Sequence, residues 1–420
     1  MSSSNSSSGS SFADKLRALG VKVGNQIETP APKNDLTIDS VVQGDFETTP
    51  LGDVFVAEQR YALEHRHGQA MLTSILPFSV ISQWAKDNRI LDLDLTSFAF
   101  VDTETSGLAG GTGTYAFLVG AARFEDNEFV LRQFFMRDPA EEPAMLEALA
   151  NFLAPCEVLV TFNGKAFDAP LLTTRYRMYQ MPVPYKDYAH LDLLPLARRL
   201  WRDRLPSRAL KYLEESILGL TRTSEEVPGY EIPWLYFDYL RTGDASQMAG
   251  VFYHNAMDVV AMSALLAHMN NILETPYEGH IQHGLDFVAI AKLFEDLGHW
   301  EEAARLFERG LEIDPNTDQG LNESDFNLAV KRLSILQKKR GDVERALQLW
   351  EEAAGRGHLY AFIELAKYHE HKARDVKTAL QWTEAAQQCA EQSAMPIYMR
   401  NHWLEQIAHR LARLRRKDSI

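Results

Sequence analysis

The alternation of hydrophobic and polar positions divides the chain near residue 277. Before that point, short apolar runs bounded by turn residues alternate with segments of helical periodicity, and we predict strands at 98–102, 115–124, 128–135 and 158–161. After that point only helical periodicity continues. The pattern therefore predicts an α/β domain followed by an all-α domain.

Helical periodicity in the first part covers 141–153, begins again in the turn that carries Asp168, and returns after Asp192. For Asp192, a helix-capping role is favoured over metal binding. The last predicted helix of this part, 251–266, is strongly apolar, and we expect it to be buried.

Length and composition indicate a multidomain globular protein. The chain has 420 residues, of which 45% are hydrophobic and 24% charged, and a chain of this length normally forms two or three domains. Ser, Pro, Asn and Asp are frequent in 1–45, which we predict to be mostly disordered. We assign 46–272 to the α/β domain and 277–420 to the helical domain.

The formal net charge of -15 argues against coating of nucleic acid by bulk electrostatics, but it permits a local basic groove. Cys156 and Cys389 are the only cysteines, so we expect neither a disulfide framework nor a cysteine zinc site. The N-terminus lacks the features of a signal peptide, and no apolar run reaches the ~18 residues that a membrane span needs. We therefore expect a soluble, cytoplasmic protein without a membrane partner.

The strand at 98–102 ends in two carboxylates, Asp102 and Glu104, that are separated by one residue. Because side chains alternate along a strand, both point to the same side, where they repel each other unless a cation or water separates them. A metal site and a solvated strand end both fit this pair. The glycine-rich segment 107–114 that follows permits close approach to a ligand, and it equally suits a plain loop.

Two further carboxylates lie on predicted helices. Asp168 falls in a first helical turn after a strand, which suits a site residue and also ordinary helix design. His254 and Asp258 are four residues apart and share a helix face. A carboxylate in so apolar a helix is costly without a partner or an ion, which favours a functional role for Asp258.

In this order, Asp102, Glu104, Asp168 and Asp258 resemble the carboxylates of the DEDD 3′-5′ exonuclease superfamily, and residues 45 to 272 more closely resemble YprB-type ribonuclease H-like domain proteins. The supporting motifs are 101–108, 162–168, 218–222 with 227–233, and 253–258. The resemblance implies a mixed sheet flanked by helices. It also implies that the four carboxylates hold two Mg²⁺ or Mn²⁺ ions, with Asp102 bridging both, for hydrolysis of DNA or RNA from a 3′ end, which we expect to be single-stranded.

His254 is our candidate for the general base, because histidine exchanges protons near neutral pH. The superfamily places either a His five residues before the last Asp or a Tyr four before it, whereas this chain has Tyr253 at five and His254 at four. Helix geometry favours His254, because a five-residue offset turns Tyr253 away from Asp258.

Several polar and aromatic side chains are candidates for substrate contacts. Asn163 and Lys165 suit a phosphate or a turn equally. A basic run suits phosphates, although a solvated face is favoured: Arg198, Arg199, Arg202, Arg204, Arg208 and Lys211. Three aromatic residues suit base stacking, although core packing is more common: Trp201, Tyr212 and Tyr230. For His65 and His67, a structural or surface role is favoured.

The helical part has the spacing of tetratricopeptide repeats, in which small residues let paired helices approach. The matching positions are Phe287, Ile290, Ala291, Phe294, Gly298, Ala303, Phe307, Gly310 and Pro315, then Gly341, Ala346, Trp350 and Ala353, then Ala366, Ala379 and Ala386. A tetratricopeptide-like solenoid suits a protein or peptide partner, and it also suits a simple brace for the first domain.

The sequence as a whole predicts a metal-dependent 3′-5′ exonuclease with a partner-binding helical domain. Two alternatives remain: a non-catalytic nucleic-acid-binding adaptor, and a protein-interaction scaffold on the same fold. Four converging carboxylates speak against an adaptor, whereas the unusual position of His254 speaks for one.

Overall fold

The computed structural model describes residues 36–107 and 113–419. Most of the predicted disordered segment and part of the glycine-rich segment therefore lie outside the described residues. The chain forms two compact units. Among the described residues, the first, here the N-terminal unit, comprises 36–74, the described part of Leu93–Leu193, and Leu210–Ala267, and the second, the C-terminal unit, comprises Ile75–Asp92, Leu194–Ala209 and 268–419. The second unit thus includes 75–92, 194–209 and 268–272, which we assigned to the first domain.

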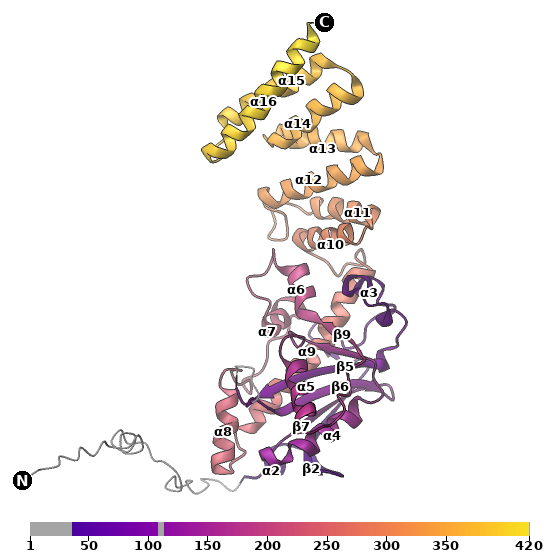
Figure 1. The fold of residues 1–420 in the computed structure, drawn as a ribbon, viewed down its shortest axis with the longest axis vertical. Helices are drawn as coiled ribbons and strands as arrows, with labels where there is room; N and C mark the ends of the chain where they lie inside the picture. Colours follow the sequence, from indigo (N-terminus) through magenta and orange to yellow (C-terminus); the bar gives the residue numbers. More distant parts are fainter. Residues whose placement is uncertain (1–35, 108–112, 420) are drawn as a thin grey trace, which may run out of the picture. The chain divides into compact units, whose positions relative to one another are not determined.

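The N-terminal unit is built on a seven-stranded mixed sheet of order β1-β2-β7-β6-β5-β8-β9, which confirms the predicted fold class (Figure 1). Its strands are β1 (Asp45–Thr49), β2 (Gly52–Ala62), β5 (Phe98–Thr105), β6 (Ala116–Glu125), β7 (Glu128–Phe135), β8 (Val158–Thr161) and β9 (Ala189–Asp192). Strand β5 runs parallel to β8, which runs parallel to β9, and the other pairs are antiparallel. A separate hairpin joins β3 (Arg66–His67) to β4 (Ala70–Met71).

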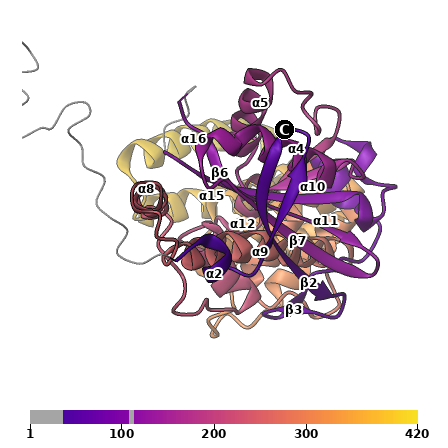
Figure 2. The same ribbon diagram turned by 90° about the horizontal axis from the view of Figure 1, so that it is seen from below.

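Helices cover both faces of this sheet (Figure 2). Neighbouring side chains of β7 show the two faces: the ring of Phe134 lies 5.9 Å from that of Phe152 on α4 (Glu142–Leu153), and the ring of Phe135 lies 5.3 Å from that of Phe252 on α9 (Met248–Glu274). Helix α5 (Asp168–Met178) lies with α4, since Arg175 of α5 binds Glu142 of α4. Strand β5 therefore ends between α5 on one face and α9 on the other.

The remaining elements of this unit are short, except α8. They are α2 (Ile38–Val41), η2 (Leu95–Ser97), η3 (Pro139–Glu141), α7 (Leu210–Leu213), η4 (Glu214–Leu218) and α8 (Ile232–Thr242). Ile38 in α2 is only 2% exposed and belongs to the core. The last residues of the segment 1–45, which we predicted to be mostly disordered, thus include one turn of helix.

Helix α9 is long and apolar enough to cross a membrane, with 27 residues and a mean hydropathy of 1.3 in its most apolar window. We predicted that no apolar run would meet this criterion, and α9 contradicts that prediction. Within the described residues, 78% of this window is buried inside the protein, as in the core helix of a globular domain. Gly120 of β6 lets α9 lie close to the sheet, since a Cβ there would lie 2.2 Å from Oδ1 of Asn255.

The C-terminal unit is helical, as predicted. Helices follow one another as antiparallel neighbours: α10 (Gly284–Asp296), α11 (Trp300–Leu311), α12 (Glu323–Arg340), α13 (Val343–Gly355), α14 (Leu359–Tyr368) with η5 (His369–Ala373), α15 (Val376–Gln392) and α16 (Ile397–Asp418). This unit also holds α3 (Ser79–Ala85), η1 (Asn88–Ile90) and α6 (Leu193–Trp201), whose first residue belongs to the N-terminal unit. Ala303, Ala346 and Ala386 are fully buried, as close helix packing requires. Gly341 has a positive φ of 86° where α12 ends.

Candidate active site

The amide of Asn255 on α9 holds one of the two carboxylates at the end of β5. Its Nδ2 donates to Oδ2 of Asp102 over 3.0 Å. Gln133 of β7 fixes the orientation of that amide, because its Nε2 donates to Oδ1 of Asn255 at 3.0 Å and to the carbonyl of Phe252 at 2.8 Å. Asn255 is fully buried. The sheet and α9 together therefore aim an N–H group at Asp102.

Asp102 and Glu104 are partly buried and surrounded by negative charge. Burial, followed by Asp258, Glu104 and Asp168, raises the pKa of Asp102 well above its usual value. Burial, followed by Asp258 and Asp168, raises the pKa of Glu104 to about 8. In the described part of the chain, neither carboxylate forms an ion pair with a basic side chain. This pair fits a bound cation.

Asp168 approaches from the opposite face of the sheet. It is the first residue of α5, and the hydroxyl of Thr103 donates a hydrogen bond to its carboxylate. Because Thr103 lies between Asp102 and Glu104 on β5, it points to the α5 side while they point to the α9 side. Burial raises the pKa of Asp168, and the hydrogen bond from Thr103 partly opposes this shift.

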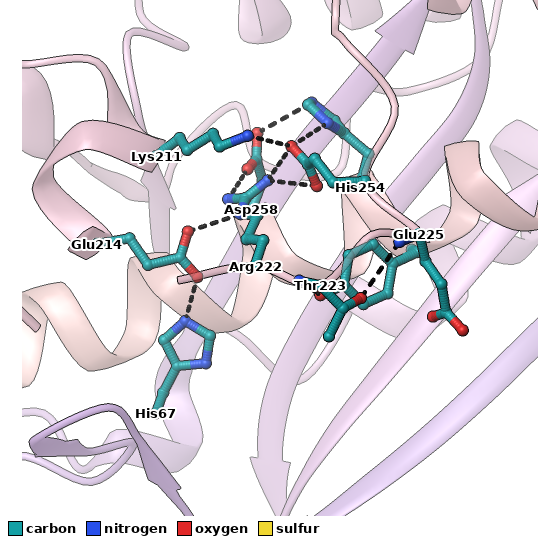
Figure 3. Close-up of polar contacts among 10 residues, drawn as sticks. His67, Lys211, Glu214, Arg222, Thr223, Glu225, His254 and Asp258 are labelled. Carbon is teal, nitrogen blue, oxygen red and sulfur yellow. Dashed lines mark hydrogen bonds and ion pairs between the residues drawn. The ribbon is translucent and has the colours of Figure 1, made fainter. Parts of the chain in front are cut away.

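Asp258, the last of the four predicted carboxylates, already has a cationic partner (Figure 3). Nη2 of Arg222 binds its Oδ1. The same guanidinium binds Glu214, with Nε 2.6 Å from Oε2, and Glu226, with Nη1 3.1 Å from Oε1. The side chain of Arg222 is only 1% exposed. One buried arginine therefore neutralises part of a cluster of three carboxylates.

His254 lies between two of these carboxylates (Figure 3). Its Nδ1 is 3.0 Å from Oε1 of Glu226, and its Nε2 is 3.7 Å from Oδ2 of Asp258. The hydroxyl of Tyr253 instead accepts the backbone N–H of Thr223 at 3.0 Å. The structure thus places His254, and not Tyr253, beside Asp258.

Five residues of this site were not among the predicted site residues: Arg222, Asn255, Glu226, Glu214 and His67. His67 is buried, and its Nε2 lies 2.6 Å from Oε1 of Glu214, a structural role of the kind that we favoured. Arg222 belongs to a motif used for the resemblance, and Asn255 follows His254 directly. Spacing along the chain gives no sign that these side chains meet.

Asn163 and Lys165 lie in the turn before α5. Asn163 has a positive φ of 69°, and its backbone N–H donates to Oδ1 of Asp192 at 2.7 Å. The N–H of Lys165 donates to Oδ2 of Asp192 at 3.1 Å. Asp192 ends β9, a strand that we did not predict, and its carboxylate holds this turn. The side chain of Lys165 is exposed.

The basic run and the aromatic candidates lie in different surroundings. In the C-terminal unit, Arg199 binds Asp296 and Arg204 lies 2.8 Å from Asp286, so these arginines are already paired. Trp201 is buried in the same unit. Tyr230, in the N-terminal unit, is 70% exposed, and core packing is wrong for this residue.

Some of the four carboxylates suit a divalent metal better than others. Among the described residues, no group of three or more His, Cys, Asp or Glu side chains converges closely enough to hold a metal ion. The pKa values of Asp102 and Glu104 are nevertheless raised, and a bound cation would lower them by favouring the ionised carboxylates. In Asp258, Oδ1 binds the guanidinium of Arg222, so this oxygen is already paired with a positive charge.

A family model described as RNase_H superfamily matches residues 99–270, and the mixed sheet with helices on both faces agrees with it. The N-terminal unit is therefore a ribonuclease H-like domain, a class whose members are typically hydrolytic nucleases that use divalent metals. Over 376 residues the chain is 32% identical to protein YprB of Bacillus subtilis (strain 168). This matched stretch covers 87% of this chain and 86% of YprB. The chain belongs to the YprB family.

One solved structure shows a weaker likeness. A family B DNA polymerase from the hyperthermophilic archaeon Pyrobaculum calidifontis is 15% identical, with a TM-score of 0.32. The match covers 48% of this chain and only 29% of the polymerase.

Proposed function

We propose that this protein is a metal-dependent 3′-5′ exonuclease that hydrolyses phosphodiester bonds at the 3′ end of single-stranded DNA or RNA. The observation that carries this proposal is the pair Asp102 and Glu104, which are partly buried, have raised pKa values and lack a basic partner in the described residues. Carboxylate oxygens in such a pair favour Mg²⁺ or Mn²⁺.

Asp102, Glu104, Asp168 and Asp258 would hold two divalent ions. Bound there, two divalent ions would activate a water, orient the scissile phosphate and stabilise the departing oxygen. Arg222 occupies Oδ1 of Asp258, whereas Oδ2 faces His254 and stays available. Arg222 would thereby limit Asp258 to a single free oxygen.

His254 is the proposed general base, and Glu226 is its positioning residue. When the Nδ1–H of neutral His254 donates a hydrogen bond to Glu226, Nε2 carries no proton and is able to take one from water. A positioned histidine of this kind contributes ~10²–10⁴-fold to the rate.

Exposed aromatic side chains on α8 and in the segment before it support a single-stranded substrate. Tyr230 is 70% exposed, and Trp234 on α8 is 74% exposed. Gly229 precedes Tyr230, and a Cβ on Gly229 would lie 3.7 Å from the His254 ring. Unpaired bases stack on exposed rings with about 1–3 kcal/mol per base, whereas paired bases are already stacked.

The test is degradation of 3′-labelled and 5′-labelled single-stranded DNA and RNA with Mn²⁺, comparing the wild type with Asp102→Asn and His254→Gln. We expect stepwise loss from the 3′ end, abolished by Asp102→Asn and reduced by His254→Gln. Fluorescence anisotropy of the uncleaved strands gives binding separately. Cleavage that survives Asp102→Asn would show that this site is not the nuclease.

The second candidate is a nucleic-acid-binding adaptor without catalysis, and the Arg222 cluster favours it. An arginine that permanently neutralises Asp258 leaves fewer ligands for metal. Binding of single strands with no cleavage under Mg²⁺ or Mn²⁺ would support the adaptor and refute the exonuclease.

We also propose that the protein is cytoplasmic and that its C-terminal helices, as tetratricopeptide-like repeats, hold a protein or peptide partner. The succession of antiparallel helices supports the second part. Fractionation of cells that produce the tagged chain tests the first part, since recovery with membranes would contradict it.

A further inference from the structure

A hollow of about 700 Å³ opens on the C-terminal unit between α12, α13, α14 and α16. We call it the helical groove. Its apolar side chains include Ile335, Ile363 and Trp403, and Ile335 is 41% exposed. A large exposed aliphatic side chain in a concave surface is typical of a site that receives an apolar group.

The helical groove is positively charged. Its lining contains one carboxylate, that of Glu364, and five basic residues, which are Lys331, Lys338, Lys339, Lys367 and Arg410. Lys338 and Lys367 both bind Glu364, at 3.0 and 2.6 Å. Arg410 binds Glu370 at 2.8 Å, so the unneutralised positive charge of the helical groove lies on the remaining two lysines.

Two of the lysines have no carboxylate partner among the described residues. Nζ of Lys331 lies 5.4 Å from the ring centre of Tyr360, and Nζ of Lys339 lies 5.5 Å from that of Trp300. Cation–π contacts of this kind leave the ammonium donors free to bind an anion. Lys331 and Lys339 therefore offer unneutralised charge at the helical groove.

Two buried donors in the wall of the helical groove lack an acceptor. Trp350 is only 2% exposed, and its Nε1 has no hydrogen-bond partner in the described part of the structure. The hydroxyl of Tyr360 is also unpaired there. Buried donors normally find acceptors, but these two are too enclosed to meet a group in the helical groove unless a side chain shifts.

We propose that the helical groove binds an acidic peptide segment of a partner protein, with carboxylates on Lys331 and Lys339 and an apolar side chain on Ile335 and Ile363. This inference rests on the proposal that the C-terminal helices hold a partner, and it is independent of nuclease activity. A single-stranded nucleic acid fits less well, because bases need open ring faces. Lys331 and Lys338 already cover one face of Tyr360 and of Trp350.

The test uses the full chain and a short fluorescent peptide of alternating aspartate and leucine, followed by anisotropy. Two comparison peptides replace aspartate by lysine or leucine by serine. The site variant is Lys331→Glu with Lys339→Glu. The matched control is Lys372→Glu with Lys377→Glu, which has the same charge change at exposed residues outside the lining.

We expect the aspartate–leucine peptide to bind more tightly than both comparison peptides, and the site variant to weaken it at least tenfold while the control binds as the wild type does. Equal weakening in both double variants would mean that only the net charge of the protein matters, and this would overturn the proposal. Tighter binding of the lysine peptide would refute the proposal that the peptide is acidic. Loss of single-stranded DNA binding in the site variant, with the peptide unaffected, would assign the helical groove to nucleic acid.

Discussion

The two ends of the carboxylate site differ in what neutralises them. At the end of β5, Asp102 and Glu104 have only the amide of Asn255 and no basic partner within the described residues. On the other side, Asp258 shares the guanidinium of Arg222 with Glu226 and Glu214. We call the end with Asp102 and Glu104 the open end, and the end with Asp258 the closed end.

The difference shows that carboxylates with the same place in a motif need not be equivalent as ligands. A buried carboxylate without a counter-charge gains most from an added cation, whereas one already paired with arginine gains little and has to give up a charge-assisted hydrogen bond. We therefore expect the open end to dominate metal binding and the closed end to dominate stability.

The largest effect is expected at the open end. Asp102→Asn keeps the shape of the side chain and removes its charge, and loss of a metal ligand worth several kcal/mol lowers cleavage about a thousand-fold. Initial rates on 3′-labelled strands measure this. Asp53→Asn, an exposed residue on β2, is the matched control and keeps full activity. Equal rates for the two variants would remove the distinction between the ends.

The next effect is expected at the closed end. Arg222→Leu leaves three carboxylates without their shared cation, which costs about 3–5 kcal/mol of unfolding free energy. The same exchange at Arg241, whose ion pair with Asp238 is about half exposed, costs about 0–1 kcal/mol. Urea unfolding measures both.

The stabilisation that divalent metal gives to the wild type and to Arg222→Leu tests the difference between the two ends. We expect Mg²⁺ or Mn²⁺ to stabilise Arg222→Leu more than the wild type, because the freed carboxylates attract a cation. Thermal unfolding with and without metal measures the difference. An equal metal-induced shift in both proteins would mean that Arg222 and metal do not compete.

Asn255→Ala tests the support of the open end. Loss of the N–H group aimed at Asp102 is expected to weaken metal affinity ~10–100-fold, as for other residues that orient ligands. Titration calorimetry with Mn²⁺ measures this. Ser263→Ala removes another buried α9 side chain, whose hydroxyl donates to the carbonyl of Leu72 at 2.9 Å, and serves as control. A similar loss of affinity in both variants would indicate a general packing defect.

A further expected effect is a dependence of stability on pH. The pKa of Glu104 is raised from 4.5 to about 8, so the folded protein keeps a proton that the unfolded chain has lost. The unfolding free energy of the metal-free protein is therefore expected to fall as pH rises from about 4.5 to about 8, and Glu104→Gln should reduce this slope. Denaturant unfolding at several pH values measures it. An unchanged slope in the variant would show that Glu104 titrates normally.

Much of the fold can be predicted from local sequence patterns. The strands and helices near Asp102, Asp168 and Asp258 follow from apolar runs and helical periodicity that each segment carries by itself. Strands β1, β2 and β9 escaped prediction. Strand β9 is only four residues long, and no local signal separates it from the helix that follows.

By itself, the sequence determined the class of the fold, the order of the four carboxylates and the helix face shared by His254 and Asp258, because these depend on local periodicity. Only the tertiary structure decided what surrounds them. Arg222 meets Asp258 from 36 residues away, and Asn255 meets Asp102 from 153 residues away. Whether a carboxylate is open or closed depends on charges that the fold brings together through space, and such neighbours leave no periodic mark along the chain.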